Sequence, residues 1–229
     1  MKKLIISNFK SNKSVEESNH WLEKLTKLVD WNSLGVYEIG VAPAYPSVEE
    51  FSHKILEANI PLKLTVQDIS AYPAGSYTGA VSFQNLSHLD IKYAIVGHSE
   101  RRRYFEETSQ MVAKKVSQAI ENNITPLLCI DDPYLEEQVS LIDDNLISKC
   151  IICYEPLEAI GSGKNVSVGQ VEKVKEKVKT LCGDVLLMYG GSVTDQNVSE
   201  YLMVTDGVLV GSFSLKAEDF ASLISKAIK

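Results

Sequence analysis

Residues 93–102, with the sequence YAIVGHSERR, join an uninterrupted apolar run to a polar cluster that begins after Gly97. The apolar part does not alternate with polar residues, which is typical of a strand that is covered on both faces. Similar runs, rich in Val, Ile and Leu, recur along the chain. The predicted strands span residues 3–9, 36–42, 62–67, 93–97, 125–130, 149–154, 185–189 and 207–210.

Amphipathic helical patterns separate these runs. Val171, Val174 and Val178, for example, repeat at spacings that place them on one helix face. The helical segment at residues 83–88 is the shortest and weakest. The alternation of strands and helices predicts an α/β fold, a closed (β/α)8 barrel with a parallel sheet inside and helices outside. An open doubly wound sheet is the alternative, but it usually has a glycine-rich turn after its first strand, and residues 8–12 contain no glycine.

The composition is that of a globular protein, with 45% hydrophobic and 23% charged residues among 229. No low-complexity linker divides the chain, so we expect residues 1–229 to form a single (β/α)8 barrel domain. The 23 basic and 30 acidic residues give a net charge of −7 without a dense basic stripe, which makes nucleic acid an unfavourable partner. The apolar run near the N-terminus is too short for a signal peptide or membrane span, so we expect a cytoplasmic location and no membrane partner.

The four cysteines include a C-x-x-C pattern at Cys150 and Cys153. Both residues fall in a predicted strand, where side chains three positions apart point to opposite faces. We therefore expect buried, small apolar side chains rather than a redox pair or a zinc site.

Polar residues gather where the predicted strands end. Asn8 and Lys10 follow the first strand, His98 and Glu100 the fourth, and Glu155 the sixth. In barrels of this kind the chemistry lies at the carboxyl ends of the strands. A lysine at a strand end is usually solvated and a single histidine is more often structural, but their coincidence with a carboxylate on one rim makes all of them candidate site residues.

Glycine-bearing turns follow the last strands of the predicted barrel. Ser192 ends a Gly-Gly-Ser turn after the seventh strand, and Gly211 and Ser212 follow the eighth. In many barrels the loops at these positions bind phosphate through backbone N–H groups. A further glycine-rich stretch, residues 161–164, lies after the sixth strand. These turns indicate a small phosphorylated substrate.

Together these motifs resemble the triosephosphate isomerase family, whose fold is the TIM barrel. Residues 96–102 resemble the signature around its electrophilic histidine, and residues 154–156 and 159–164 resemble its catalytic glutamate and mobile lid. Residues 8–10, 189–193 and 206–211 resemble its motifs on strands 1, 7 and 8. The similarity extends over essentially the whole chain.

The resemblance implies interconversion of dihydroxyacetone phosphate and D-glyceraldehyde 3-phosphate by proton transfer through an enediol or enediolate, in glycolysis and gluconeogenesis. It implies Glu155 as the base, a neutral His98 as the electrophile and Lys10 as the electrostatic clamp, with supporting roles for Asn8 and Glu100. The pKa of Glu155 is expected to rise when the lid excludes water. The residues implied in substrate and phosphate binding are Asn8, Lys10, Ile160, Gly161, Ser192, Gly211 and Ser212.

The resemblance also implies a homodimer in which the loop from Tyr72 to Gly79 (YPAGSYTG) reaches into the site of the partner subunit. No cofactor and no metal are implied. Ala80 stands where the family usually has Glu, which puts one intersubunit contact of Arg101 in doubt.

The chain departs from the family pattern at several further positions. Leu157 and Glu158 replace the usual Val-Trp pair after the catalytic Glu-Pro, and Asn165 replaces a threonine at the other hinge of the lid. Ser212 replaces a glycine but keeps its backbone N–H. Asp131 and the residue after it stand where Gly-Glu is usual.

Two other functions compete with the isomerase. Another phosphate-binding barrel enzyme, such as an isomerase or lyase, would share the turns after strands 7 and 8 but has no reason to carry both the His98 and the Glu155 motifs. A non-catalytic barrel would be expected to lack Lys10, His98 or Glu155, and all of them are present.

Overall fold

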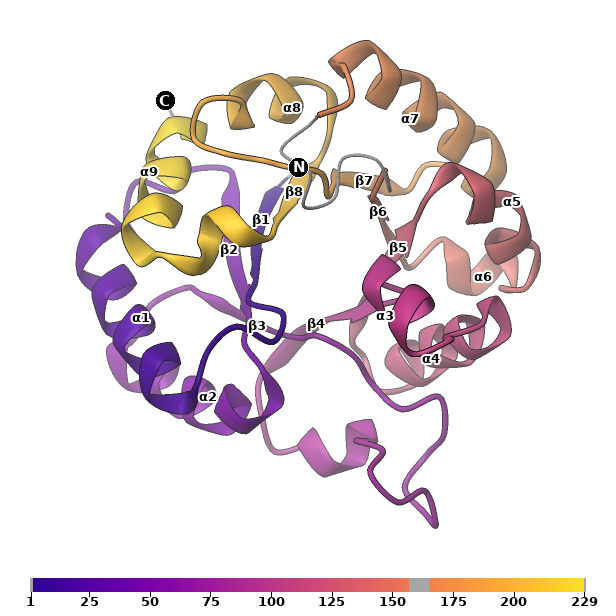
Figure 1. Cartoon of the computed structure of the whole chain (residues 1–229), viewed down its shortest axis with the longest axis horizontal. Coiled ribbons are helices and arrows are strands. Elements are labelled where there is room, and N and C mark those ends of the chain that lie inside the picture. Colours follow the sequence, from indigo (N-terminus) through magenta and orange to yellow (C-terminus); the bar gives the residue numbers. More distant parts are fainter. Residues whose placement is uncertain (1, 157–164, 229) are drawn as a thin grey trace.

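The computed structural model describes residues 2–156 and 165–228. Its strands form one closed parallel barrel in chain order, surrounded by helices (Figure 1). β1 closes the ring because Ile5 pairs with Ile39 of β2 on one side and with Val208 of β8 on the other. The strands are β1 Lys3–Asn8, β2 Tyr37–Ala42, β3 Lys63–Val66, β4 Ile91–Val96, β5 Thr125–Ile130, β6 Ile151–Tyr154, β7 Leu186–Tyr189 and β8 Gly207–Val210. The predicted (β/α)8 barrel is confirmed, and the open sheet is wrong.

The predicted boundaries of β5 and β8 coincide with the observed ones, and those of the other strands differ by one or two residues at one or both ends. β4 begins at Ile91 rather than at residue 93 and ends at Val96, because Gly97 leaves the extended conformation with a φ of +70°. A Cβ atom at Gly97 would lie 2.9 Å from the Arg102 guanidinium, so this turn requires glycine. The sixth strand starts later than predicted because Cys150 still belongs to a turn that precedes β6.

The outer helices begin at residues that can cap them. Ser14 opens the first helix with a capping box, in which its hydroxyl accepts the N–H of Glu17 and the Glu17 carboxylate accepts the N–H of Ser14. The helices are α1 Val15–Leu28, α2 Val48–Ala58, α3 Ser99–Tyr104, α4 Ser109–Glu121, α5 Asp132–Ser140, α6 Asp144–Ile147, α7 Val168–Cys182, α8 Val198–Val204 and α9 Ala217–Ala227. The short 3-10 helices are η1 Tyr45–Ser47, η2 Phe83–Leu86 and η3 Ser212–Leu215. The weak helix predicted at residues 83–88 is therefore a single 3-10 turn.

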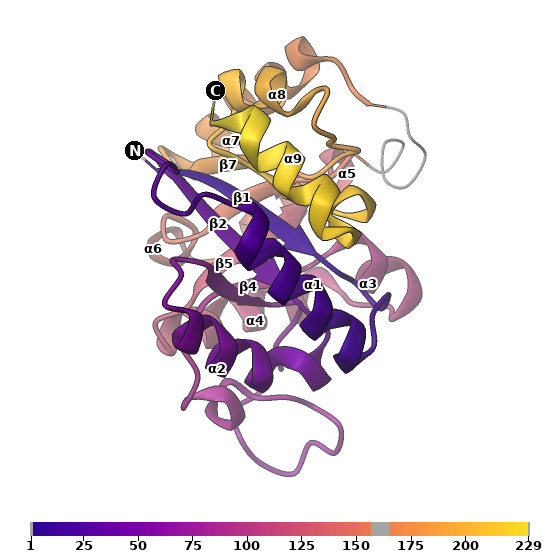
Figure 2. The same cartoon turned by 90° about the vertical axis from the view of Figure 1, so that its left-hand side faces the viewer.

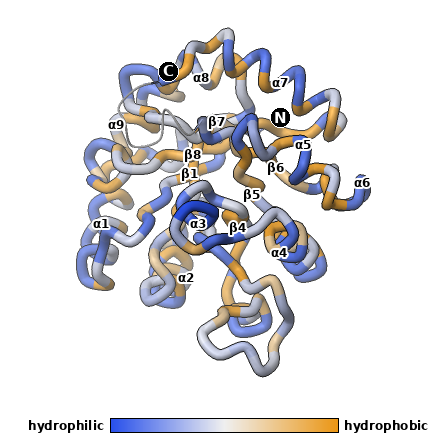
Figure 3. Tube along the Cα trace, turned by 45° about the vertical axis from the view of Figure 1, so that its right-hand side comes forward, coloured by the Kyte–Doolittle hydropathy of each residue, from blue (hydrophilic) through white to orange (hydrophobic). Residues whose placement is uncertain are grey.

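Apolar residues fill two regions. One lies between the sheet and the helices, where hydrophilic and apolar stretches alternate along helices such as α7 (Figure 3). The other fills the barrel, and β6 shows how alternation divides them: Ile151 and Cys153 face the interior, whereas Ile152 and Tyr154 face the helices. The same alternation directs the next residue, Glu155, towards the barrel axis.

The cysteines follow this division. Cys153 belongs to the core inside the barrel and Cys150 to the core under the helices, and all four cysteines are free and buried. The prediction that Cys150 and Cys153 are buried among apolar residues is confirmed. Along the described part of the chain, no helix is both long and apolar enough to span a membrane.

The connection between β3 and β4 projects furthest from the barrel (Figure 2). Within this connection Tyr72 and Tyr77 stack with their ring centroids 4.7 Å apart, and both remain partly exposed. This projection contains the loop from Tyr72 to Gly79 that the sequence indicated as a contact surface.

Candidate active site

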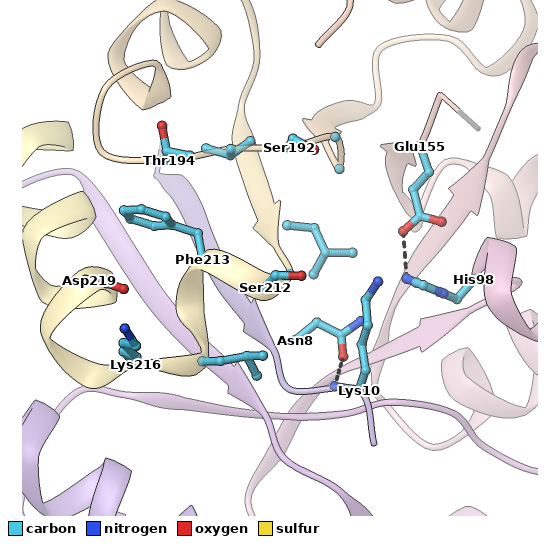
Figure 4. A pocket seen from close by; sticks show the side chains of 16 residues that line it. Asn8, Lys10, His98, Glu155, Ser192, Thr194, Ser212, Phe213, Lys216 and Asp219 are labelled. Atoms are coloured by element: carbon cyan, nitrogen blue, oxygen red, sulfur yellow. Dashed lines mark hydrogen bonds and ion pairs between the residues drawn. The ribbon is translucent and has the colours of Figure 1, made fainter. Parts of the chain in front are cut away.

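A pocket of about 560 Å³ opens at the carboxyl ends of the strands, where the polar strand-end residues meet (Figure 4). Its walls come from the segments that follow β1, β4, β6, β7 and β8. The described residues that line it are Asn8, Lys10, His98, Glu155, Gly190, Gly191, Ser192, Val193, Thr194, Leu209, Gly211, Ser212, Phe213, Leu215, Lys216 and Asp219. The convergence predicted for this rim is therefore present.

Glu155 lies at the end of β6 with only 2% of its surface exposed. Its Oε1 atom is 3.0 Å from Nε2 of His98, and its Oε2 atom accepts the backbone N–H of Ser99 at 3.1 Å. Its side chain passes so close to Gly190 that a Cβ atom there would lie 2.9 Å from Cγ of Glu155. The carboxylate is thus held between α3 and the turn after β7.

His98 is the N-cap residue of α3 and is also buried. Its Nδ1 atom accepts the backbone N–H of Glu100 at 3.2 Å. A ring nitrogen that accepts a hydrogen bond carries no proton, so this contact places the proton of a neutral imidazole on Nε2. Nε2 then donates to Glu155.

The environment shifts the pKa values of both residues in opposite directions. Burial alone would raise the pKa of Glu155, but His98, the Ser99 N–H and Lys10 outweigh burial and hold this pKa below its ordinary value. Burial alone would lower the pKa of His98, but the Glu155 carboxylate outweighs it and the net shift is upward. Electrostatic attraction therefore stabilises the pair in this substrate-free arrangement. A rise of the Glu155 pKa on exclusion of water stays a prediction.

Lys10 reaches the pocket from a strained backbone position with a φ of +52°. Side chains hold it there, because its N–H donates to Oδ1 of Asn8 at 3.0 Å and its carbonyl accepts from Gln67 at 2.9 Å. Its Nζ atom is 2.8 Å from Oε1 of Glu100. This arrangement fixes a positive charge at the mouth of the barrel.

The turn after β7 is shaped by its neighbours. A Cβ atom at Gly191 would overlap the hydroxyl of Tyr189, so only glycine allows this path. The amide of Asn197 donates to the carbonyl of Ser192 at 3.1 Å and accepts the N–H of Thr194 at 2.8 Å. Asn197 therefore closes the turn from outside. Across the pocket Gly211 lies beside Lys10, with 3.8 Å between the position of a Cβ atom and Nζ.

The structure brings most of the predicted site residues together. Glu100 contacts Lys10 but does not line the pocket itself. Ile160, Gly161, the substitutions Leu157 and Glu158, and the rest of the predicted lid lie outside the described residues. The remaining predicted residues, which all line the pocket, are Asn8, Lys10, His98, Glu155, Ser192, Gly211 and Ser212.

Some lining residues were not predicted from the sequence. Thr194, Phe213, Lys216 and Asp219 also border the pocket. They lie in the loop after β7, in η3 and at the start of α9, where the path of the chain depends on tertiary packing, and no local pattern marks them. The backbone N–H of Ser99 was also missed, although the start of a helix directly after His98 could have indicated a donor there.

The site combines a buried carboxylate, an imidazole N–H and a lysine with the glycine turns that follow β7 and β8. Such a set can accept a proton, donate to a carbonyl oxygen and bind an anion. Within the described ranges, no group of three or more His, Cys, Asp and Glu side chains could hold a metal ion. The fold and these residues define a (β/α)8-barrel enzyme with its site at the carboxyl ends of the strands.

Comparison with known proteins identifies the family. The family model described as triosephosphate isomerase matches residues 3–227. Similar proteins named triosephosphate isomerase include that of Mesomycoplasma hyorhinis, which is 34% identical over 98% of both chains, and that of Thermus thermophilus, which is 33% identical over 96% of this chain and 97% of the relative. The protein of that name from Clostridium botulinum is 34% identical over 97% of this chain and 98% of its own. The chain belongs to the triosephosphate isomerase family.

Proposed function

We propose that the chain interconverts dihydroxyacetone phosphate and D-glyceraldehyde 3-phosphate in glycolysis and gluconeogenesis. Membership of the family supports this reaction. The observation that carries the proposal is the contact between Glu155 and His98 at one end of a pocket that also contains Lys10. A proton acceptor and a hydrogen-bond donor within 3.0 Å of each other can act on a carbon and on the oxygen of the adjacent carbonyl group.

The reaction transfers a proton between neighbouring carbons. The Glu155 carboxylate removes a proton from the carbon next to the carbonyl group, and the electrons of that C–H bond form the carbon–carbon double bond of an enediolate. The Nε2–H of His98 stabilises the charge that develops on the carbonyl oxygen. Glu155, now protonated, returns the proton to the other carbon, while His98 moves a proton between the two oxygens. The base is regenerated and no electron is exchanged with a cofactor.

Substrate binding has to separate the pair. In the substrate-free structure Oε1 of Glu155 occupies the hydrogen bond that Nε2 of His98 would offer to a carbonyl oxygen. A substrate oxygen that takes this bond leaves Glu155 without its strongest partner, which raises the pKa of Glu155 and makes it a better base. Binding thereby activates the residue that performs the chemistry.

The other polar residues support this step. Lys10 places a fixed positive charge near the substrate oxygens, and Asn8 and Glu100 hold its backbone and its ammonium group. The proposed phosphate ligands Ser192, Gly211 and Ser212 line the same pocket as Glu155. Ile160 and Gly161 remain part of the proposal on the resemblance alone, as does a mobile lid between Glu155 and Asn165.

A homodimer through the loop from Tyr72 to Gly79 belongs to the same proposal. The projection of this loop and the exposure of Tyr72 and Tyr77 support it (Figure 2). Ala80 put one intersubunit contact of Arg101 in doubt. Within its own chain, the Arg101 guanidinium contacts the carboxylates of Asp68 at 2.9 Å and Glu107 at 2.6 Å. A cytoplasmic location is consistent with four free cysteines, since thiols persist in reducing compartments.

A coupled assay with D-glyceraldehyde 3-phosphate tests the activity. We expect turnover by the wild type and a loss of at least about 10³-fold in kcat for Glu155→Gln, because the amide cannot accept the proton. Glu38→Gln is the matched control: Glu38 is also a buried carboxylate, but it lies near the amino end of β2, where it bonds to the hydroxyl of Tyr93. Equal activity of wild type and Glu155→Gln would contradict the role of Glu155, and a wild type without turnover would contradict the proposed function.

A further inference from the structure

Two stacked tyrosines lie behind the pocket, outside the set of residues that line it. Tyr201 on α8 stacks on Tyr189 at the end of β7, with ring centroids 4.1 Å apart and an angle of 20° between the planes. Both side chains are buried. The hydroxyl of Tyr201 donates to the backbone carbonyl of Val166 at 2.8 Å. A buried hydroxyl needs such a partner, so this bond defines the position of Val166 relative to α8.

Tyr189 connects the stack to the turn after β7. Its hydroxyl occupies the space that a Cβ atom of Gly191 would need, so the ring and the turn are in direct contact. The same hydroxyl lies 3.4 Å from Oδ1 of Asn165. The two rings therefore fill the space between residues 190–192 and residues 165–166, which precede α7.

α8 contacts the turn at a second point on the same side. Asn197, which precedes Tyr201 by four residues and thus lies about one helical turn away, binds the carbonyl of Ser192 and the N–H of Thr194. One side of this short helix therefore holds both the turn after β7 and the segment at residues 165–166. A change in the position of Tyr201 would be transmitted to both.

We propose that Tyr201 is a positioning residue that sets the affinity for the phosphate group of the substrate. The inference rests on the proposed function, in which the turn at residues 190–192 binds this phosphate. Tyr201 does not line the pocket. It acts through Tyr189, which supports Gly191, and through its bond to Val166. Because the phosphate group is attached to the third carbon of the triose and the proton moves between the other two carbons, weaker phosphate binding destabilises the bound substrate and the transition state alike, which raises KM and leaves kcat unchanged.

Tyr201→Phe removes the hydroxyl and keeps the stacked ring. We expect KM for D-glyceraldehyde 3-phosphate to rise about fivefold, as for the net loss of one neutral hydrogen bond, with kcat within about twofold of wild type. The dissociation constant of inorganic phosphate, measured by calorimetric titration, should rise by the same factor. Thr205→Val is the matched control, because it removes another buried hydroxyl of the α8 region, one that bonds to the carbonyls of Tyr201 and Gly207 and not to Val166.

The control should lower the melting temperature without changing KM or the dissociation constant of phosphate. The proposal is overturned if Tyr201→Phe leaves both constants within about twofold of wild type, or if Thr205→Val raises them equally. The calorimetric titration does not depend on turnover. A wild type that binds phosphate without isomerising the triose would therefore contradict the proposed function, while the comparison of the variants would still decide the role of Tyr201.

Discussion

Nε2 of His98 and Oε1 of Glu155 lie 3.0 Å apart, and both side chains are buried at the carboxyl end of the barrel. The two residues come from different strands, β4 and β6, and their contact depends on the closure of the sheet. The pair lowers the pKa of Glu155 and raises that of His98, although burial acts on each in the opposite direction. In the proposed mechanism, a substrate oxygen must therefore replace this contact before Glu155 can act as the base.

Substitution of His98 removes the donor to the carbonyl oxygen. We expect His98→Gln to lower kcat about 10²- to 10⁴-fold, the range found when one electrostatic stabiliser or acid–base group is lost. His53→Gln, on the exposed side of α2, is the control and should retain wild-type kcat. Steady-state kinetics with both variants checks this, and a kcat of His98→Gln within tenfold of wild type would exclude the proposed role.

The turn after β7 depends on the space available at Gly191. A methyl group there would overlap the hydroxyl of Tyr189, so Gly191→Ala must displace the turn or the ring. We expect KM to rise at least about tenfold, because displaced N–H groups no longer converge on the phosphate. Gly169→Ala provides the control, since a Cβ atom at Gly169 meets no atom within 4 Å. If both variants had the KM of wild type, Gly191 would not be required for substrate binding.

Glu107 belongs to a buried ion-pair cluster and should make stability depend on pH. Its carboxylate lies 2.6 Å from both Lys115 and Arg101. Burial acts to raise the pKa of Glu107, but the Lys115 ammonium and the Arg101 guanidinium outweigh it and the pKa is lowered. Because the pKa of Glu107 is lower in the folded state than in the unfolded state, its carboxylate stabilises the fold fully at pH values above the unfolded-state pKa. This stabilisation is lost as the pH falls through the folded-state pKa.

Glu107→Gln should therefore destabilise the fold by about 3 kcal/mol at pH 7, as expected for one partner removed from a buried pair. The difference between variant and wild type should shrink as the pH falls from about 4.5 towards the lowered pKa. Urea unfolding at neutral and acid pH measures this trend. A difference that stays constant or grows on acidification would show that the charge of Glu107 is not what stabilises the cluster.

Glu106 has a left-handed backbone that suits glycine better than glutamate. Its φ is +54° and its side chain is exposed. We expect Glu106→Gly to stabilise the fold by about 1 kcal/mol, because glycine adopts this conformation without the steric cost of a Cβ atom. Glu121→Gly at the end of α4 should instead destabilise it. Thermal unfolding compares the two, and a destabilised Glu106→Gly would show that the side chain makes a compensating contact.

The sequence was sufficient to predict the barrel because the period of its apolar residues changes consistently between strand and helix. The alternation of strands and helices also predicted that His98, Lys10 and Glu155 lie on one rim, since parallel strands in a barrel end at the same side. The observed end of β4 and start of β6 differ from the predicted ones because of local turns. The turn at Gly97 packs against Arg102, and the turn at Cys150 is closed by its N–H bond to the carbonyl of Ile147.

Contacts between distant segments were beyond sequence reasoning. The contact between Glu155 and His98 depends on rotamers that only the packed barrel defines. The sequence analysis assigned roles to both residues without predicting that they meet. The stack of Tyr189 and Tyr201 has the same origin, because nothing near Tyr201 in the chain indicates a ring of β7 or the carbonyl of Val166.

Proton exchange with solvent tests the central claim, that Glu155 removes a proton from the substrate carbon. Dihydroxyacetone phosphate incubated in D2O with wild-type enzyme should exchange one of the two hydrogens on its hydroxymethyl carbon, because a single carboxylate approaches from one side. Proton NMR follows the loss of that signal. Glu155→Gln should show no exchange above the uncatalysed rate, whereas Glu38→Gln should exchange like wild type. Exchange by Glu155→Gln at the wild-type rate would contradict the assignment of the base.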